Sequence, residues 1–306
     1  MKTALILGIT GKFGREMAMA LTNKGWNVKA IVRGRKHLTE QHSNYQIVEG
    51  SYQDKALLES ESEGVDLIVY AINLPYPDWH RLALSMLEPV VQLAERKKYH
   101  VLFPGNVYSY EPSLTPITED APMVGVTPKG EIRKEMELRL LAAANNGAKV
   151  TIIRAGDFIS EGVGGEWLKM MLKKRGNERF VMRQPHSSTH RHFWSYLPDL
   201  CTNAVSAVEQ QSLQYELWHD SGLVLTGKDW QHAFKVIGYK LDLSDFPWWS
   251  LSILAFFVPL IREVKEMKYL WEKELILDGS KLQRQLGTEF KHSSLEMIVA
   301  QLVRKS

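Results

Sequence analysis

Short runs of apolar residues alternate along this chain with longer stretches in which apolar residues recur every three or four positions. Short continuous runs are typical of strands buried on both faces, and the longer periodic stretches are typical of helices with one apolar face. The alternation of the two indicates an α/β fold with a doubly wound parallel sheet of the Rossmann type. The pattern predicts strands at residues 4–7, 27–32, 45–48, 67–71, 100–103 and 149–154, and helices at residues 12–24, 54–62, 78–98 and 129–146.

Beyond residue 155 the alternation becomes irregular. Helical periodicity returns at residues 167–174 and 197–211, and a short strand is predicted at residues 180–182. We therefore expect residues 1–155 to form a dinucleotide-binding portion. Residues 156–306 should form mostly a smaller C-terminal substrate lobe, interleaved with strands that return to the main sheet. Because no Ser/Gly linker separates the two parts, we expect one compact unit.

Three glycines at intervals of three residues join the first predicted strand to the first predicted helix. In such a unit the first glycine permits a tight turn, the second lets the backbone approach a pyrophosphate, and the third allows close helix–strand packing. The free N–H groups at the helix N-terminus also favour a phosphate. This context predicts a nicotinamide dinucleotide site, with a plain turn that binds no ligand as the alternative. The predicted cofactor-binding residues of the turn are Gly8, Thr10, Gly11, Lys12, Phe13 and Gly14.

The residues after the second predicted strand distinguish between cofactors. A site for NAD places an acidic residue about twenty residues beyond the glycines, where it binds the adenosine ribose. This chain has Arg33 and Arg35 there, and no acidic residue between the first predicted helix and Glu40. Because guanidinium groups bind phosphate in bidentate fashion, we predict NADP rather than NAD. An ordinary solvated basic loop is the alternative.

Composition and charge narrow the range of partners. The chain has 306 residues, of which 44% are hydrophobic, and can bury a large core. Its 38 basic and 35 acidic residues are interspersed, so the net charge of +3 gives no support for nucleic-acid binding. The single cysteine, Cys201, excludes an internal disulfide and suits a reducing compartment. Met1 leads directly into the first predicted strand without a signal peptide, and we expect a cytoplasmic protein.

Motifs outside the glycine turn extend over most of the chain. They are Glu49-Gly-Ser-Tyr-Gln-Asp54, Phe103-Pro-Gly-Asn-Val-Tyr108, Thr118-Glu-Asp-Ala-Pro122, Thr127-Pro-Lys-Gly130, Arg154-Ala155 with Gly162, Trp194-Ser-Tyr-Leu-Pro-Asp199 and Asp278-Gly-Ser-Lys-Leu282. Together with the turn, these motifs resemble the extended and atypical short-chain dehydrogenase/reductases, the NAD(P)-dependent epimerase/dehydratase group. The resemblance implies this fold, a nicotinamide cofactor and a small-molecule substrate. It also implies that Ala71, Asn73 and Pro104, at the ends of the fourth and fifth strands, contact the cofactor.

The residues that such enzymes use for catalysis are changed in this chain. Members of the family use a Ser or Thr after the fifth strand, a Tyr as acid and base, and a Lys four residues after the Tyr. Aligned on the motifs, Pro104 stands in the Ser/Thr place, Lys129 in the Tyr place and Arg133 in the Lys place. The resemblance therefore implies the fold and the cofactor but not the usual chemistry. We take Lys129, Arg133 and Tyr108 as the candidate catalytic residues.

Lys129 and Arg133 lie one helical turn apart, so their charges repel unless something negative lies between them. An anionic substrate or the cofactor's phosphate would meet that need. In a dry site the helix dipole and Arg133 would lower the pKa of Lys129, which would let it act as acid and base. The alternative is a solvated helix in which Arg133 pairs with Glu137 and Glu131 flanks Lys129. Other candidate donors near the strand ends are Asn106 and Tyr110.

A histidine cluster and a long apolar run are weaker features of the sequence. His186, His190 and His192 have a spacing compatible with metal binding, but no carboxylate or cysteine completes the set, and we expect no metal. The apolar run at residues 246–258 is shorter than the roughly 20 residues needed to span a bilayer. We interpret the run as a core helix or as the face of a homodimer, and expect no membrane partner.

These observations lead to two hypotheses. The first is an NADP-binding atypical short-chain dehydrogenase/reductase that transfers hydride to or from a nucleotide sugar or a similar anionic small molecule. The second is a sensor or regulator that binds NADP(H) without turnover, which the loss of all three usual catalytic residues favours.

Overall fold

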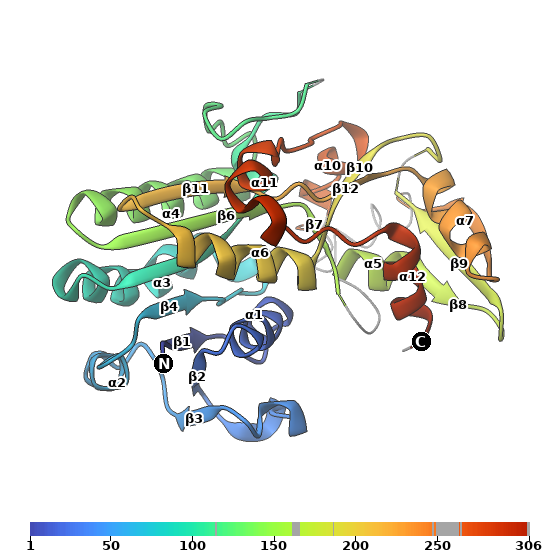
Figure 1. Cartoon of the computed structure of the whole chain (residues 1–306). Helices are drawn as coiled ribbons and strands as arrows, with labels where there is room; N and C mark the ends of the chain where they lie inside the picture. Colours follow the sequence, from blue (N-terminus) through green and yellow to red (C-terminus); the bar gives the residue numbers. More distant parts are fainter. Residues whose placement is uncertain are drawn as a thin grey trace.

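The computed structural model describes residues 1–113, 115–160, 166–185, 187–246, 248, 263 and 265–304. Its centre is a seven-stranded parallel sheet in the order β11-β6-β5-β4-β1-β2-β3 (Figure 1). The strands are β1 (Thr3–Leu7), β2 (Asn27–Val32), β3 (Gln46–Glu49), β4 (Leu67–Tyr70), β5 (His100–Asn106), β6 (Lys149–Ala155) and β11 (Tyr215–His219). The predicted Rossmann-type α/β fold is confirmed. The seventh strand, β11, comes from the second half of the chain and lies at the sheet edge beside β6.

Helices cover both faces of this sheet, which explains why its strands are continuously apolar. Successive side chains of a strand point to opposite faces. Accordingly Ala4 and Ile6 of β1 belong to one core, and Leu5 and Leu7 belong to another. The first core lies under α1 (Lys12–Asn23), α6 (Leu197–Gln210) and α11 (Ser280–Leu286), and the second lies under α2 (Lys55–Glu61), α3 (Trp79–Lys97) and α4 (Pro128–Asn145).

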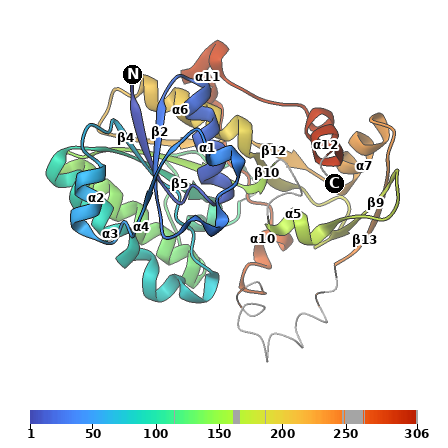
Figure 2. The same cartoon turned by 90° about the horizontal axis from the view of Figure 1, so that it is seen from below.

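A second group of elements has its own core. It contains a sheet of β7 (Asp157–Ile159), β10 (His192–Tyr196) and β12 (Leu223–Leu225), and a sheet of β8 (Leu172–Lys174), β9 (Arg179–Gln184) and β13 (Lys240–Asp245). Its helices are α5 (Glu166–Met171), α7 (Gly227–Val236), α10 (Tyr269–Glu272) and α12 (Leu295–Arg304). Figure 2 shows α5, α7, α12 and β9 together on one side of the main sheet. Short 3-10 helices occur at η1 (Arg35–His37), η2 (Glu40–His42), η3 (Tyr76–Asp78), η4 (Val107–Ser109) and η5 (Gly287–Glu289).

The helix predicted at residues 167–174 is correct only in its first part. The helix α5 ends at Met171, and β8 then pairs antiparallel with β9, placing Leu172 opposite Met182. The apolar residues at helical spacing do not reveal this change, because strand pairing with a segment ten residues away overrides the local pattern.

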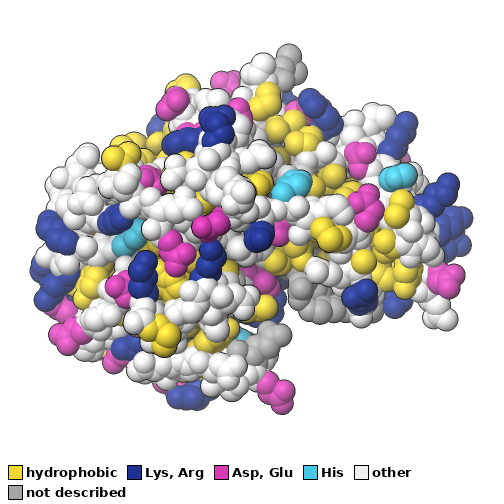
Figure 3. All heavy atoms as spheres, viewed as in Figure 1, with side chains coloured by type: hydrophobic (Ala, Val, Ile, Leu, Met, Phe, Trp, Pro, Cys, Tyr) yellow, Lys and Arg dark blue, Asp and Glu magenta, His cyan; other side chains and the backbone are white. Residues whose placement is uncertain are grey.

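The surface seen in Figure 3 carries Lys, Arg, Asp and Glu side chains interspersed, as the sequence suggests. Within the described ranges, no helix combines the length and apolar character needed to cross a membrane. The same residues contain no group of three or more His, Cys, Asp or Glu side chains arranged to hold a metal ion. His186, Gly162 and most of the apolar run at 246–258 lie outside the described residues.

Candidate functional site

The glycine turn brings the start of α1 against the end of β4. Gly8 has φ of +97°, and a Cβ there would lie 2.5 Å from the carbonyl oxygen of Ala71. A Cβ on Gly14 would overlap the carbonyl oxygen of Gly8. Both positions therefore require glycine. Gly11 begins α1 without any side-chain cap, which leaves the first N–H groups of the helix for another partner.

A cavity of about 380 Å³ opens beside this turn. Its wall starts at the N-terminus of α1 and runs across the carboxyl ends of β4, β5 and β6. The strand order reverses between β1 and β4, and doubly wound sheets bind ligands at that point. The cavity is therefore the candidate functional site.

The structure brings most of the predicted site residues to this cavity. The predicted residues in its wall are Gly11, Lys12, Phe13, Ala71, Asn73, Pro104, Asn106, Tyr108 and Arg133. Gly8, Thr10 and Gly14 form the turn beneath the wall but do not line it. Lys129 does not line the cavity either. Arg33 and Arg35 are exposed at the end of β2, where Arg35 Nε lies 3.5 Å from Glu49 Oε2.

Arg133 is a buried cation in the cavity wall, with only 8% of its surface exposed. Its guanidinium donates a hydrogen bond to the carbonyl oxygen of Pro104 and lies 4.7 Å from the ring centre of Phe103 and 5.6 Å from that of Trp79. No carboxylate of the described residues lies within ion-pairing distance, and Nε is buried without a hydrogen-bond partner. Burial lowers the pKa of this guanidinium from its ordinary value of 12.5.

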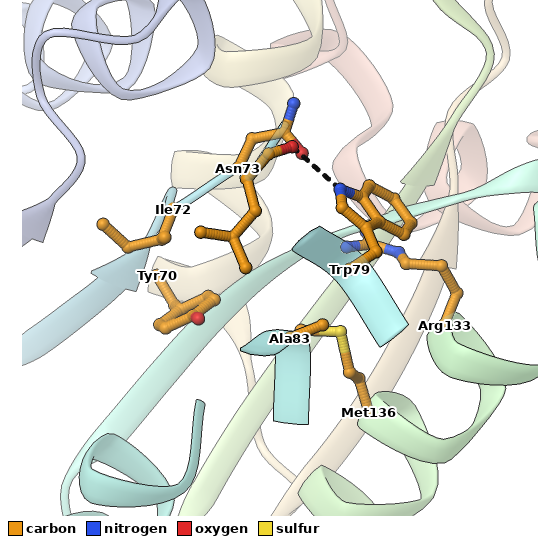
Figure 4. A pocket seen from close by; sticks show the side chains of 8 residues that line it. Tyr70, Ile72, Asn73, Trp79, Ala83, Arg133 and Met136 are labelled. Atoms are coloured by element: carbon orange, nitrogen blue, oxygen red, sulfur yellow. Dashed lines mark hydrogen bonds between the residues drawn. The ribbon is translucent and has the colours of Figure 1, made fainter. Parts of the chain in front are cut away.

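A smaller niche lies beside Arg133, and Figure 4 shows its lining. It has a volume of about 10 Å³, which is close to the space that one water molecule requires. The indole of Trp79 closes one side and donates a hydrogen bond of 2.8 Å to the carbonyl oxygen of Leu74. This hydrogen bond holds Trp79 beside the guanidinium of Arg133, and the niche is too small for a ligand larger than water, which leaves the main cavity as the place for one.

Lys129 is buried to 2% exposure, and the protein itself neutralises its charge. Thr127 caps the start of α4, and the ammonium of Lys129 lies between the carboxylates of Glu263 and Glu266, with Nζ 2.5 Å from Glu266 Oε2. The alternative of a solvated helix is therefore wrong for Lys129 and Arg133. The ion pair between Arg133 and Glu137 that this alternative assumed is also wrong, because Glu137 pairs with Arg154.

Two phenols of the cavity wall are hydrogen-bonded to each other. The hydroxyl oxygens of Tyr76 and Tyr108 are 3.1 Å apart, and the Asn106 side chain fixes the Tyr108 backbone by accepting from its N–H at 3.0 Å. Burial raises the pKa of Tyr76 to about 12 and that of Tyr108 well above 10, so both hydroxyls are protonated at neutral pH. Tyr110 lies elsewhere, because its hydroxyl bonds to Arg154 and His219 in the protein interior.

Asp157 is a cavity residue that the sequence analysis missed. Its Oδ2 lies 2.8 Å from Nε2 of His192, whose imidazole stacks in parallel on Trp271 with ring centres 3.6 Å apart. Asp157 follows β6 in the chain as Asn73 follows β4, so its place after a buried strand was the available signal. Other lining residues missed from the sequence are Ile72, Tyr76, Trp79, Gly105, Val107, Ala155, Gly156, Phe158 and Trp167.

Comparisons with known proteins agree with this geometry. Residues 8–112 match the NAD(P)H-binding family. An 82-residue stretch is 36% identical to the (4-alkanoyl-5-oxo-2,5-dihydrofuran-3-yl)methyl phosphate reductase of Streptomyces griseus, covering 26% of this chain and 29% of that enzyme. The chain thus matches less than a third of the length of this relative.

Solved structures share the fold over nearly the whole chain. A Burkholderia cenocepacia protein provisionally named an epimerase is 16% identical with a TM-score of 0.75, covering 99% of this chain and 97% of its own. The NAD complex of dTDP-glucose 4,6-dehydratase from Bacillus anthracis is 12% identical to this chain, with a TM-score of 0.73. The NAD complex of UDP-glucose 4-epimerase from Brucella ovis is 14% identical, with a TM-score of 0.72. These cover 100% and 99% of this chain, and 96% and 98% of theirs. The expected resemblance to the epimerase/dehydratase group is thus confirmed at the level of the fold, and the family match shows an NAD(P)H-binding portion at residues 8–112.

Proposed function

We propose that this chain, whose residues 8–112 match the NAD(P)H-binding family, is an NADP(H)-dependent oxidoreductase acting on an anionic small molecule such as a nucleotide sugar or another phosphate ester. It works without the Ser/Thr-Tyr-Lys set of its relatives. The observation that carries the proposal is Arg133, a buried cation that faces the cavity and has no carboxylate partner among the described residues.

A buried charge without a counter-ion destabilises a protein by several kcal/mol, roughly the desolvation cost that remains after relaxation. One hydrogen bond to Pro104 and two aromatic faces offset only part of that cost. An anionic ligand in the cavity would supply the missing charge. A phosphate or carboxylate of the substrate would be that anion, because the cofactor's pyrophosphate belongs at the glycine turn.

The residues present fit a nicotinamide dinucleotide. The uncapped start of α1 and the backbone of Gly11 face the cavity and would hold the pyrophosphate. Arg33 and Arg35 are exposed at the end of β2, where they would hold a 2′-phosphate. When bound, NADP(H) supplies or accepts the hydride.

Tyr108 and Tyr76 would handle the proton. Because burial keeps both hydroxyls protonated, Tyr108 would donate a hydrogen bond to a substrate carbonyl oxygen, with Tyr76 relaying to it over 3.1 Å. Lys129 would act one step behind them, since its ammonium lies 5.2 Å from the ring centre of Tyr76 and is held by Glu263 and Glu266. We therefore propose Tyr108 and Arg133 as residues that contact the substrate, and Lys129 as a residue that positions Tyr76.

The relatives give independent support for the substrate class. The similar Streptomyces enzyme is named as the reductase of a dihydrofuranylmethyl phosphate, and the two NAD-bound enzymes of similar fold are named for UDP-glucose and dTDP-glucose. All three substrates carry phosphate. This shared feature agrees with a cation placed in the cavity wall.

The test is turnover with a paired substrate panel. NADPH or NADP⁺ is incubated with phosphorylated carbonyl compounds, nucleotide sugars and their uncharged counterparts, and the nicotinamide absorbance is followed. We expect oxidation or reduction of the cofactor only with the charged members. Faster turnover of the uncharged counterparts would contradict the role of Arg133.

The second candidate is a sensor that binds NADP(H) without turnover. The observation that favours it is the replacement of all three family catalytic residues by Pro104, Lys129 and Arg133, with Lys129 held in ion pairs. Tight dinucleotide binding in calorimetry, together with an unchanged nicotinamide absorbance across the whole panel, would favour the sensor over the enzyme.

A further inference from the structure

We propose that Asp157 makes the protein discriminate between the two oxidation states of its cofactor, favouring the oxidised nicotinamide over the reduced one. This inference rests on the proposed binding of NADP(H). It does not depend on which substrate is used, or on whether any substrate is turned over.

Asp157 lies over the half of the sheet that should bind the nicotinamide. A doubly wound sheet binds the two mononucleotides of its cofactor over its two halves. Arg33 and Arg35 mark the half that contains β2 as the adenosine side. The other half consists of β4, β5 and β6, and Asp157 follows β6 after two residues and lines the cavity there. The nicotinamide end of the cofactor therefore belongs on the side of Asp157.

The surroundings of Asp157 fix its carboxylate in place. Asp157 stands opposite Trp194 in the pairing of β7 with β10, and His192 lies two residues earlier on β10, on the same face. The imidazole of His192 binds Oδ2 at 2.8 Å and is itself held against the indole of Trp271. The side chain of Asp157 is only 15% exposed, so water screens its charge weakly.

The charge of the nicotinamide ring differs between the two oxidation states of the cofactor. The oxidised ring is a cation and the reduced ring is neutral, so a fixed carboxylate nearby attracts only the oxidised form. The groups close to Asp157 are the imidazole of His192 and the hydroxyls of Tyr76, Tyr108 and Tyr269. Arg133 lines the same cavity. The hydroxyls are neutral because burial raises the pKa of all three phenols. Asp157 is thus the only carboxylate among the described residues that line the cavity.

The experiment compares dissociation constants by calorimetry for NADP⁺ and NADPH at one fixed pH. The variant is Asp157→Asn, which keeps the shape and can still bond to His192. We expect NADP⁺ to bind about tenfold more weakly to the variant, while the affinity for NADPH changes less than about twofold, as expected for one partly screened charge pair. Asp157→Glu retains the charge and should preserve most of the discrimination. The control variant Asp120→Asn removes an exposed carboxylate that does not line the cavity, and it should change neither dissociation constant.

The outcomes separate this inference from the proposed function. If both dinucleotides bind and their ratio of affinities is the same in Asp157→Asn as in the wild type, the inference is wrong and the proposed function stands. If neither dinucleotide binds the wild type, both are wrong. Should Asp157→Asn not fold, as judged by circular dichroism, Asp157→Ser serves as the neutral variant, and an unchanged ratio there refutes the inference equally.

Discussion

Arg133 offers the sharpest test of the reasoning, because the structure contains a second buried arginine with the opposite surroundings. Arg133 is 8% exposed and has no carboxylate partner among the described residues, whereas Arg154 is 1% exposed and pairs with the buried carboxylate of Glu137. We compare Arg133→Met with Arg154→Met. Methionine keeps much of the apolar stem and removes the charge in both variants.

The magnitudes follow from the contacts. Arg133→Met loses a charged hydrogen bond to Pro104, about 1.5–3 kcal/mol, and two aromatic contacts of roughly 1 kcal/mol each. It also removes a buried cation that has no carboxylate within ion-pairing distance among the described residues, which offsets a loss of that size. We expect its free energy of unfolding to stay within about 1 kcal/mol of the wild type. Arg154→Met leaves Glu137 buried without a partner and should lose about 3–5 kcal/mol.

The assay is chemical denaturation, supported by thermal melting in the absence of ligand. At roughly 2–4 °C per kcal/mol, and with Arg133→Met within about 1 kcal/mol of the wild type, Arg154→Met should melt at least about 4 °C below Arg133→Met. Arg133→Met should also lose most of its affinity for the charged members of the substrate panel. If the free energy of unfolding falls equally in both variants, the contacts of the Arg133 guanidinium within the protein already stabilise it, and the proposal of an anionic ligand is wrong.

Four further predictions concern single groups. Arg33→Ala combined with Arg35→Ala should weaken NADP⁺ binding at least about tenfold in calorimetry and leave NAD⁺ binding unchanged, because both side chains are exposed and only NADP⁺ carries the 2′-phosphate. Tyr108→Phe should lower kcat about 10²-fold to 10⁴-fold in steady-state kinetics and leave cofactor affinity unchanged, since it removes only the hydroxyl that donates the proton and bonds to Tyr76. Lys129→Met should lower the free energy of unfolding by about 3 kcal/mol in denaturant, because it strands two carboxylates, and an unaltered stability would contradict the ion pairs. Asp220 is buried, and desolvation raises its pKa from 3.8 to about 6. Its contribution to stability is therefore complete below pH 3.8 and is lost as the pH rises to about 6, so the free energy of unfolding of the wild type should fall by about 3 kcal/mol over that range relative to Asp220→Asn.

Matched controls keep these experiments specific. Lys36→Ala removes another exposed cation from the same loop and should not change the preference between NADP⁺ and NAD⁺. Tyr239→Phe lies outside the cavity wall and should leave kcat unchanged. A wild-type stability curve parallel to that of Asp220→Asn between pH 4 and 6 would refute the assignment of the titrating group.

The sequence by itself determined the fold and predicted the place of the cofactor site. The continuous apolar runs and helical periodicities predict the main sheet, because strands and helices of this type are encoded locally and a strand covered on both faces must be apolar throughout. The glycine turn is also local: the spacing of Gly8, Gly11 and Gly14 already requires close approaches of the backbone.

The tertiary structure alone decided what the charged residues do. Lys129 and Arg133 share one helix and one spacing, yet Lys129 meets carboxylates from residues 263 and 266 and Arg133 meets none among the described residues. The pairing of Asp157 with His192 likewise joins segments 35 residues apart in the chain. A charge is compensated by whatever folding packs against it, and those neighbours come from distant segments whose arrangement no local pattern contains.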